Sequence, residues 1–376
     1  GDNCLSKRTQ EKSVNWTLQW GKMTQARFMS QHWQQSPLLI RQAFADFKPV
    51  LSPQQLFELA AQEDVESRLV RQSDQGQWSV AHGPFRRRQL PSTRQSRWTL
   101  LLQGMDLHHD DLSRLMRVFR FVGEARLDDL MISYASDGGG VGPHLDNYDV
   151  FLLQAHGVRE WRIGPVKRIQ WQKGAPLKLL RQFKPEQVLT LHPGDMLYLP
   201  PGYGHDGVAV GSDCMTYSIG FRSPTQGELA RQVIQRHLEA EDSDVTDELA
   251  QGIRYSDQGM KATTQPGRIP QALTQFGRHA IASLLDQVQD FDLAMGEVLT
   301  EPKPRVWFQA QPLARLTACR LDGRSRMLWN DTHVFLNGEA WRVKGDDARL
   351  LRELADRREL NAAQVRGAST ALRALL

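Results

Sequence analysis

The chain has 376 residues, with 47 Lys or Arg against 43 Asp or Glu, so its formal net charge is +4. Hydrophobic residues make up 40% and charged residues 24% of the chain, which excludes a disordered protein. No apolar run approaches the roughly 20 residues of a membrane-spanning helix, so we expect no membrane association. Three cysteines are too few for a disulfide framework and no secretory signal is visible, so we expect a cytoplasmic protein. The length of 376 residues predicts two or three domains.

The first third of the chain mixes helical and strand patterns behind a polar segment, residues 1–14, that predicts a disordered tail. Ser52-Pro53 has the residue types of a helix N-cap and first helical position. The elements expected after the tail are a helix over 24–35, a strand over 36–41, a helix from Ser52-Pro53, strands over 67–70 and 77–81, and a helix over 112–121.

Between residues 128 and 223 the pattern changes to short β-like runs separated by glycine and proline. The runs are residues 130–134, 149–154, 159–163, 187–191, 195–199 and 215–221. Several short strands with regular turns are typical of an all-β sandwich or barrel. We assign residues 15–224 to one domain that contains this barrel.

After residue 224 the chain turns helical, with apolar spacing over 227–240 and 270–299. These helices are too few to bury their apolar faces alone, so we expect them to pack on a partner chain. Glu301-Pro-Lys-Pro304 predicts a hinge. A small α+β module is expected beyond it, with strands over 325–328, 332–336 and 340–343 and helices over 346–355 and 361–376.

Two motifs of the β-rich region carry residues suited to a metal. His144-x-Asp146 follows a glycine-rich lead-in, and on an extended strand this spacing points both side chains to one face. His205 follows a strand and a Pro-Pro-Gly turn, and it could return to the same end of a barrel. Two imidazoles and one carboxylate form the facial triad of non-haem Fe(II) oxygenases, which leaves coordination positions open.

The sequence around these residues resembles the JmjC-type cupins, and more narrowly the bacterial ribosomal oxygenases that hydroxylate an arginine of a ribosomal protein. GGGVGPHLDNYDVFLLQ at 138–154 resembles the first cupin motif, and PGDMLYLPPGYGH at 193–205 resembles the second. Shorter resembling segments lie at 32–41, 65–70, 78–85, 127–133 and 217–224. The resemblance implies a mainly β fold with helices: a double-stranded β-helix (cupin jelly roll), a helical dimerisation segment at 225–300 and a winged-helix-like domain at 301–376.

The resemblance also implies an Fe(II)- and 2-oxoglutarate-dependent dioxygenase. It makes His144, Asp146 and His205 the iron ligands and the catalytic centre. Arg159 would hold the distal carboxylate of 2-oxoglutarate, a role that suits the two-pronged guanidinium. Ser133 would donate a hydroxyl hydrogen bond to the same carboxylate. The implied substrate is a large-subunit (50S) ribosomal protein, hydroxylated on the β-carbon of an arginine, and the implied assembly is a homodimer.

A cationic arginine substrate needs acceptor groups close to the metal. Asp137, Asp149 and Asp206 lie in the loops and strand ends next to the motifs, so each is a candidate for holding the substrate guanidinium.

The residues alone leave three alternative functions open. A JmjC demethylase of methylated lysine or arginine would use the same triad, and a non-catalytic metal-binding cupin scaffold would bind protein or RNA. The third concerns the last module, because residues 301–376 carry 12 Arg and 2 Lys against nine Asp and Glu. Direct RNA binding by these arginines is possible, but we favour a structural module whose arginines are solvated or ion-paired.

Overall fold

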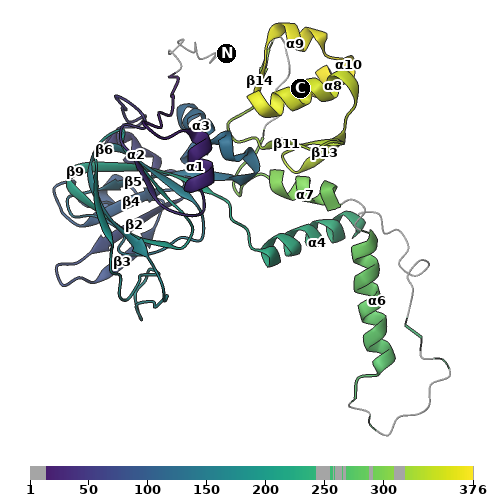
Figure 1. Cartoon of the computed structure of the whole chain (residues 1–376), viewed down its shortest axis with the longest axis horizontal. Coiled ribbons are helices and arrows are strands. Elements are labelled where there is room, and N and C mark those ends of the chain that lie inside the picture. The colour runs from purple at the N-terminus through teal and green to yellow at the C-terminus, as the bar shows by residue number, and fades with distance from the viewer. Residues whose placement is uncertain are drawn as a thin grey trace. The chain divides into compact units, whose positions relative to one another are not determined.

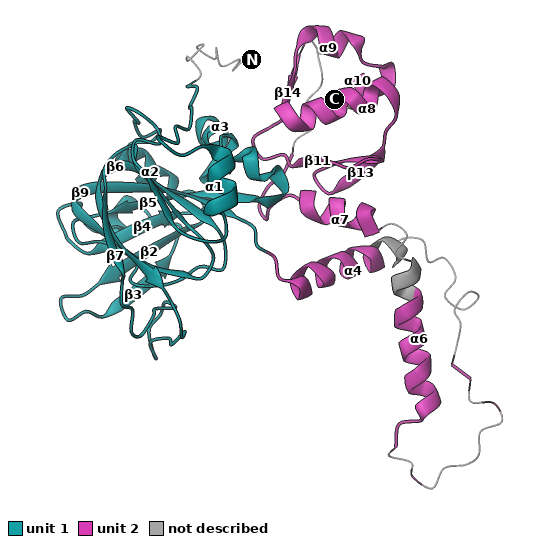
Figure 2. Cartoon of the chain, in the orientation of Figure 1, with its two compact units in different colours: residues 1–223 teal, residues 224–376 magenta. Residues whose placement is uncertain are grey.

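The computed structural model describes residues 14–242, 255, 256, 258, 265, 268–287, 291–308 and 318–375. The predicted tail at 1–14 therefore lies outside the described residues except for Val14. The chain divides into two compact units, Gly1–Ser223 and Pro224–Leu376 (Figure 2). None of the described helices is long and apolar enough to cross a membrane.

Unit 1 is built on one nine-stranded sheet (Figure 1). Eight strands follow the order β1-β8-β6-β9-β5-β4-β2-β3, and β7 pairs with β6. The strands are β1 (Leu38–Ile40), β2 (Ser67–Gln72), β3 (Trp78–His82), β4 (Trp98–Leu102), β5 (Leu127–Ala135), β6 (Val150–Pro165), β7 (Gln187–Leu191), β8 (Met196–Leu199) and β9 (Tyr203–Phe221).

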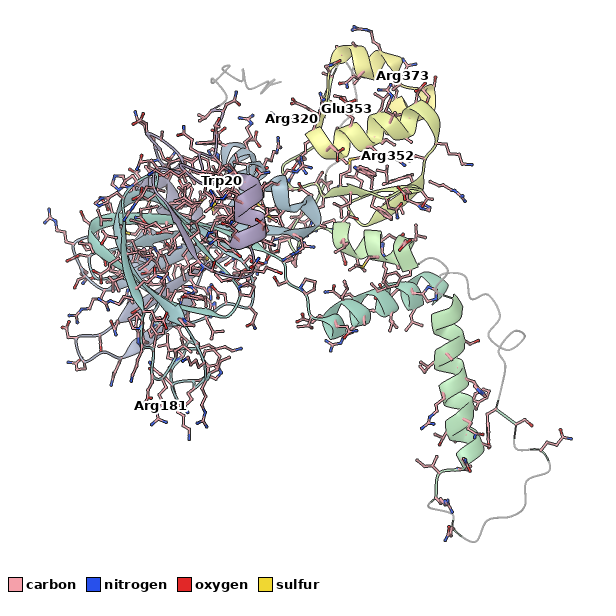
Figure 3. The ribbon with its side chains drawn as sticks, viewed as in Figure 1. Trp20, Arg181, Arg320, Arg352, Glu353 and Arg373 are labelled. Atoms are coloured by element: carbon pink, nitrogen blue, oxygen red, sulfur yellow. The ribbon has the colours of Figure 1, made fainter. Side chains whose placement is uncertain are left out.

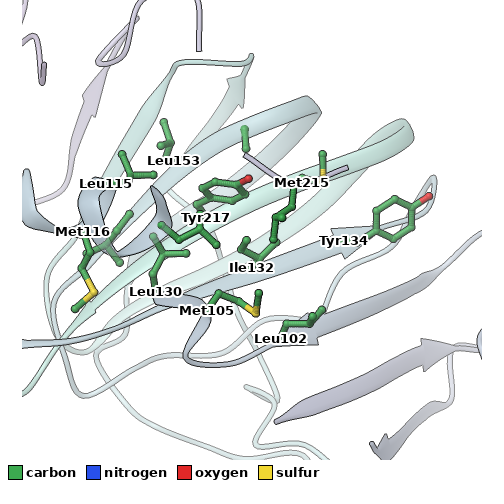
Figure 4. Packing of buried hydrophobic residues seen from close by; sticks show 14 of the residues in the cluster. Leu102, Met105, Leu115, Met116, Leu130, Ile132, Tyr134, Leu153, Met215 and Tyr217 are labelled. Carbon is green, nitrogen blue, oxygen red and sulfur yellow. The ribbon is translucent and has the colours of Figure 1, made fainter. Parts of the chain in front are cut away.

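Three short α-helices of unit 1 contribute to the core at the sheet: α1 (Gln25–Gln31), α2 (Pro53–Leu59) and α3 (Asp110–Arg117). The predicted capping of α2 is confirmed, because the Ser52 hydroxyl accepts from the Gln55 N–H and the Gln55 side chain accepts from the Ser52 N–H. In Figure 4, Leu115 and Met116 of α3 lie close to Leu130 of β5 within the buried core.

Two details of the strand prediction differ from the structure. Residues 149–154 and 159–163 were expected as separate strands, but β6 is one strand that pairs with β9 along its length. The sequence reasoning also missed β4, whose five residues are all buried and show no alternation of polar and apolar side chains.

A β-bulge explains why β6 resembled two strands. The pairing of β6 with β9 shifts register on both sides of His156, and Gly157 adopts a φ of +67° that favours glycine. The buried Gln154 side chain donates from Nε2 to the carbonyls of His156 (2.9 Å) and Gly157 (3.2 Å). This amide supplies hydrogen bonds to backbone carbonyls at the irregular stretch.

Asp195 ties the turn before β8 to the segment after β1. Its buried carboxylate accepts from the N–H groups of Gln42 (2.9 Å) and His192 (3.0 Å) and from Nη1 of Arg41 (2.9 Å). Burial alone raises the pKa of Asp195, but these hydrogen bonds outweigh it and hold that pKa below its ordinary value.

Asp195→Asn is expected to lower the free energy of unfolding by about 2 kcal/mol, because an NH₂ group then faces N–H donors. A carboxylate whose pKa falls on folding stabilises the protein above its unfolded-state pKa of about 4, and this contribution is lost as pH falls through the folded-state pKa. Urea unfolding at pH 7 and below pH 4 measures both effects, with the exposed Asp46→Asn as control. An equal loss of stability for both variants would contradict this role.

Unit 2 combines helices with two small sheets. Helix α7 packs against α4 and against the three-stranded sheet, and Gly296 makes this approach possible, because a Cβ there would lie 2.3 Å from the Phe335 ring. Its elements are α4 (Gln226–Asp242), α6 (Gln271–Gln287), α7 (Phe291–Thr300), β10 (Cys319–Arg320), β11 (Met327–Trp329), β12 (His333–Leu336), β13 (Glu339–Arg342), α8 (Gly345–Arg357), β14 (Glu359–Leu360), α9 (Ala362–Gly367) and α10 (Thr370–Leu375). The division of this unit at residue 300 stays a prediction.

Candidate metal and co-substrate site

The structure brings the three predicted metal ligands together. One potential ligand atom from each of His144, Asp146 and His205 lies within 4.8 Å of the others. Oδ2 of Asp146 is 3.4 Å from Nε2 of His205 and 3.9 Å from Nε2 of His144. Three converging donor atoms of these types can hold a divalent metal and leave part of its coordination sphere open.

Backbone pairing positions the two histidines. His205 lies near the start of β9, and its N–H and C=O bond to the C=O and N–H of His144 at 2.9 and 3.0 Å. The expectation that His144 and Asp146 share an extended strand is wrong, because both lie in the loop between β5 and β6, where His144 forms an isolated β-bridge. The single bridge to His205 takes the place of the predicted strand.

Each imidazole is oriented by a backbone carbonyl. Nδ1 of His144 is 2.9 Å from the Gly142 oxygen, and Nδ1 of His205 is 3.0 Å from the Tyr203 oxygen. Because a carbonyl oxygen only accepts, each Nδ1 carries the proton and each Nε2 presents its lone pair, as a metal ligand requires.

The charges of the triad also suit a metal. Burial, helped by the neighbouring His205, lowers the pKa of His144 to about 4, so this imidazole is neutral at pH 7. Burial raises the pKa of Asp146, but the adjacent imidazoles of His205 and His144 outweigh burial and leave that pKa lowered, so the carboxylate is ionised at pH 7. A neutral imidazole and an ionised carboxylate are the protonation states that bind metal.

A cavity of about 330 Å³ lies over the triad. Its size falls in the range of small-molecule sites, which begins at about 300 Å³. Its polar lining includes Arg68, Thr99, Gln103, Asp129, Ser133, His144, Asp146, Tyr148, Arg159, Lys178, His205, Thr216 and Ser218.

Arg159 is the buried cation of this cavity. It is 4% exposed, and its Nη1 donates to the Gly207 carbonyl at 3.3 Å. Within the described residues, its Nε and Nη2 and the indole Nε1 of the neighbouring Trp161 have no hydrogen-bond partner. Buried N–H groups without acceptors cost free energy, so a bound anion that accepts from them is favoured.

Similarity to known proteins agrees with this geometry. A family model described as the JmjC domain matches residues 114–229. The chain is 37% identical over 284 residues to the ribosomal protein uL16 3-hydroxylase of Escherichia coli K12, covering 73% of this chain and 71% of that protein.

The fold extends the likeness to nearly the whole chain. The crystal structure of Escherichia coli YcfD matches with a TM-score of 0.81 and 31% identity over 96% of both chains. A structure described as YcfD, a ribosomal oxygenase, in complex with cobalt and 2-oxoglutarate, matches with a TM-score of 0.76 and 32% identity over 96% of this chain and 94% of that one.

The chain belongs to the JmjC ribosomal oxygenases. The predicted mainly β cupin fold and the prediction of an oxygenase are thereby confirmed. The two groups predicted from the sequence, a divalent metal and 2-oxoglutarate, are those bound in the YcfD complex, with cobalt as the metal.

The site of this ribosomal oxygenase fits both groups. His144, Asp146 and His205 offer two nitrogen atoms and one carboxylate to a metal. Arg159 offers N–H groups to a carboxylate. Ser133 is 6% exposed on β5 and lines the same cavity as Arg159. It lies opposite Thr216 of β9, whose hydroxyl donates to Oε1 of Gln154 at 3.1 Å.

The bulge in β6 aims Arg159 into the cavity. Before the bulge, the even-numbered residues Val150 and Leu152 line the cavity, whereas after it the odd-numbered Arg159 and Trp161 do. Side chains alternate across a strand, so a regular strand would have placed Glu160 in the cavity and Arg159 outside.

The prediction that Asp137, Asp149 or Asp206 holds the substrate guanidinium is wrong, because none of these three described residues lines the cavity. Asp137 is exposed and accepts from the Gly211 N–H at 2.8 Å. Asp149 is fully buried and accepts from the Tyr198 hydroxyl at 2.6 Å.

Asp206 fails as a candidate for a different reason. It directly follows His205 on β9, and adjacent residues of a strand point to opposite faces. Its register partner is Arg162, which lies on the exposed side of β6.

Sequence reasoning missed Asp129 and Tyr148, which line the cavity. Asp129 is 7% exposed, and its Oδ2 accepts from the Gln103 side chain and from the Gly104 N–H. The Tyr148 side chain lies against Asp146, and burial together with that carboxylate raises the pKa of its hydroxyl. The available signal was the alternation of β5, which places Asp129, Met131 and Ser133 on one face.

Proposed function

We propose that this protein is an Fe(II)- and 2-oxoglutarate-dependent hydroxylase of an arginine side chain, at the β-carbon, in a large-subunit (50S) ribosomal protein. The observation that carries the proposal is the cavity, which joins an open triad, a buried guanidinium and a second carboxylate, Asp129. The relative named a ribosomal protein uL16 3-hydroxylase supports the substrate class. A ribosomal protein substrate also supports the predicted cytoplasmic location.

Each group of the cavity has a defined part in this reaction. Fe(II) and 2-oxoglutarate, when bound, supply the oxidation: O₂ and 2-oxoglutarate give succinate and CO₂ while a C–H bond becomes C–OH. His144, Asp146 and His205 hold the metal, and Arg159 with Ser133 holds the distal carboxylate of 2-oxoglutarate. The apolar side chains of the wall limit the access of water.

Asp129 supplies negative charge for the substrate. Its carboxylate lies at the wall beside Gly220, where a Cβ would come within 3.3 Å of Oδ1. Glycine at this position leaves room beside the carboxylate, which would suit a long cationic side chain of the substrate. A carboxylate and a guanidinium form a strong charge-assisted pair.

Asp129→Asn is therefore expected to raise the KM for the substrate peptide about tenfold or more, because the charge-assisted bond is lost. The KM for 2-oxoglutarate should stay within about twofold, since Arg159 and Ser133 are unchanged. Asp206→Asn, on the outer face of β9, is the matched control. Equal peptide KM values for the Asp129 variant and the wild type would remove Asp129 from substrate binding.

Mass spectrometry of a ribosomal-protein peptide tests the function as a whole. Incubation with the enzyme, Fe(II), 2-oxoglutarate and ascorbate should add about 16 Da to an arginine, as C–H becomes C–OH. Succinate formation without this gain would keep the oxygenase and reject the substrate. Loss of a methyl group from a methylated lysine or arginine peptide would favour the demethylase alternative over the proposal. If neither succinate nor product forms, the non-catalytic scaffold would replace the proposal.

We also propose a homodimer formed through the predicted segment 225–300. Helix α6 exposes Leu273 (41%) and Ile281 (59%), and burial of such side chains against a second copy is favourable. Light scattering at micromolar concentration should give twice the chain mass, and a monomer mass would reject the dimer.

A further inference from the structure

The loop between β6 and β7, residues 166–186, is a structured element beside the cavity. Backbone N–H groups of Gln172 and Arg181 donate to the carbonyls of Leu179 and Gln170, each at 2.8 Å, so the loop folds back on itself. The Leu180 N–H donates to the Pro143 carbonyl at 2.8 Å, one residue before His144. The loop is thus attached to the segment that carries a predicted metal ligand.

This loop carries a concentration of positive charge. Its only acidic residue is Glu186, at its end. Figure 3 shows Arg181 at the margin of unit 1 with its side chain directed away from the ribbon. The cations, all exposed, are Lys167, Arg168, Lys173, Lys178, Arg181 and Lys184. None of the six forms an ion pair within the part of the chain that the structure describes. We call residues 166–186, which carry these six cations, the basic loop.

The basic loop also exposes an aromatic ring among its cations. Trp171 is 41% exposed and Ile169 is 53% exposed, although Leu179 and Leu180 of the same loop are buried. A groove or surface that combines cations with an accessible indole suits single-stranded nucleic acid, because phosphates pair with the cations and bases stack on the ring. An acidic peptide would use the cations alone.

The location links this surface to the reaction. Lys178 and Leu179 line the cavity, and so does Arg68 of β2. At Gly142, a Cβ would lie 2.7 Å from the Leu179 side chain and 3.0 Å from Trp78 of β3, so the loop closely borders the segment before His144. A polyanion on the basic loop would lie next to the cavity that receives the substrate.

We propose that the basic loop binds single-stranded RNA beside the active-site cavity. This goes beyond the proposed hydroxylation and adds a second contact to it: an enzyme that acts on a ribosomal protein would also touch RNA that accompanies the protein. The cations would neutralise phosphates and Trp171 would stack on a base. Such binding needs neither metal nor 2-oxoglutarate.

Three arginines of unit 2 are less suited to this role, because each has an acidic partner. Arg324 pairs with Asp322 at 2.8 Å, Arg357 with Glu353 at 3.3 Å and Arg349 with Asp346 at 3.8 Å. These pairs agree with the structural reading of the last module, whereas the cations of the basic loop lack such partners among the described residues.

Fluorescence anisotropy with a labelled, mixed-sequence single-stranded RNA of about 12 nucleotides tests the proposal on the full chain without added metal. The variant Arg168→Gln/Lys173→Gln/Arg181→Gln should bind about tenfold or more weakly at 0.1 M salt. The slope of log K against log salt should fall in magnitude by about 2, since each phosphate contact on a single strand contributes about 0.7. Trp171→Ala should weaken binding at least about fivefold.

The matched control removes three exposed arginines from unit 2: Arg342→Gln/Arg366→Gln/Arg373→Gln. This control should bind RNA like the wild type, and all variants should keep their circular dichroism spectra and melting temperatures. If the control variant loses affinity and the basic-loop variant does not, the proposal is overturned in favour of the last module. Competition by polyglutamate as strong as by RNA, with no effect of Trp171→Ala, would overturn it in favour of an acidic protein.

These outcomes are independent of hydroxylation. RNA binding without peptide hydroxylation would keep the basic loop and reject the proposed function. Hydroxylation with no RNA binding at 0.05 M salt would keep the function and reject the basic loop as an RNA site.

Discussion

His144→Ala is expected to abolish hydroxylation and to weaken divalent-metal binding by more than about a hundred-fold. Loss of a residue that merely orients a metal ligand costs about 10–100-fold in affinity, so loss of a ligand should cost more. The two remaining donors, Asp146 and His205, lie 3.4 Å apart and cannot replace the missing imidazole nitrogen. Titration calorimetry with Mn²⁺ measures the metal affinity, and succinate formation measures turnover.

The control is His192→Ala, which makes the same chemical change at an exposed histidine. His192 bonds to Asp195 through its backbone N–H and its backbone carbonyl, so its side chain can be removed without loss of these bonds. The control should retain wild-type metal affinity and turnover. Metal affinity within threefold of the wild type in His144→Ala would mean that the triad is not the metal site.

The second large effect is expected at Arg159. Arg159→Met should weaken 2-oxoglutarate binding about 30- to 1000-fold, because the loss of one partner of a buried ion pair costs about 2–4 kcal/mol. The 2-oxoglutarate affinity of Arg159→Lys should lie between those of the wild type and Arg159→Met, because an ammonium keeps the charge but lacks the planar, two-pronged geometry of a guanidinium. Titration of the metal-loaded protein with 2-oxoglutarate measures both.

A stability measurement separates this role from a structural one. Arg159 is 4% exposed, and its Nε and Nη2 have no hydrogen-bond partner among the described residues. Replacing such a buried cation by an apolar side chain of similar length should leave the melting temperature unchanged or raise it. A markedly lower melting temperature for Arg159→Met, with unchanged 2-oxoglutarate affinity, would show that the residue serves the fold.

The triad could be predicted from the sequence because its information is local. His144 and Asp146 stand two residues apart, and His205 follows a Pro-Pro-Gly turn within a second motif. A local motif does not specify the backbone that presents it, however. The expected strand is a loop, and the two histidines are joined by a single antiparallel bridge.

The substrate acceptors could not be predicted because nearness in sequence was taken for nearness in space. Asp137, Asp149 and Asp206 are all close in sequence to predicted ligands, but strand alternation and burial take them away from the cavity. Asp129 lies 15 residues before His144 and reaches the cavity because β5 and β9 are paired. The long-range pairing of strands, which a single sequence does not reveal, decides which carboxylate faces the substrate.

The bulge at Gly157 makes the position of Arg159 depend on the length of β6. Deleting one residue between Gln154 and Arg159 would shift the rest of β6 by one position, so every later side chain would point to the opposite face of the sheet. Glu160 would then enter the cavity in place of Arg159, turning a binding site for an anion into one that repels it. We therefore expect a one-residue deletion in this stretch to abolish 2-oxoglutarate binding, whereas the Gln154 amide, bonded to the carbonyls of residues 156 and 157, stabilises the bulge at its present length.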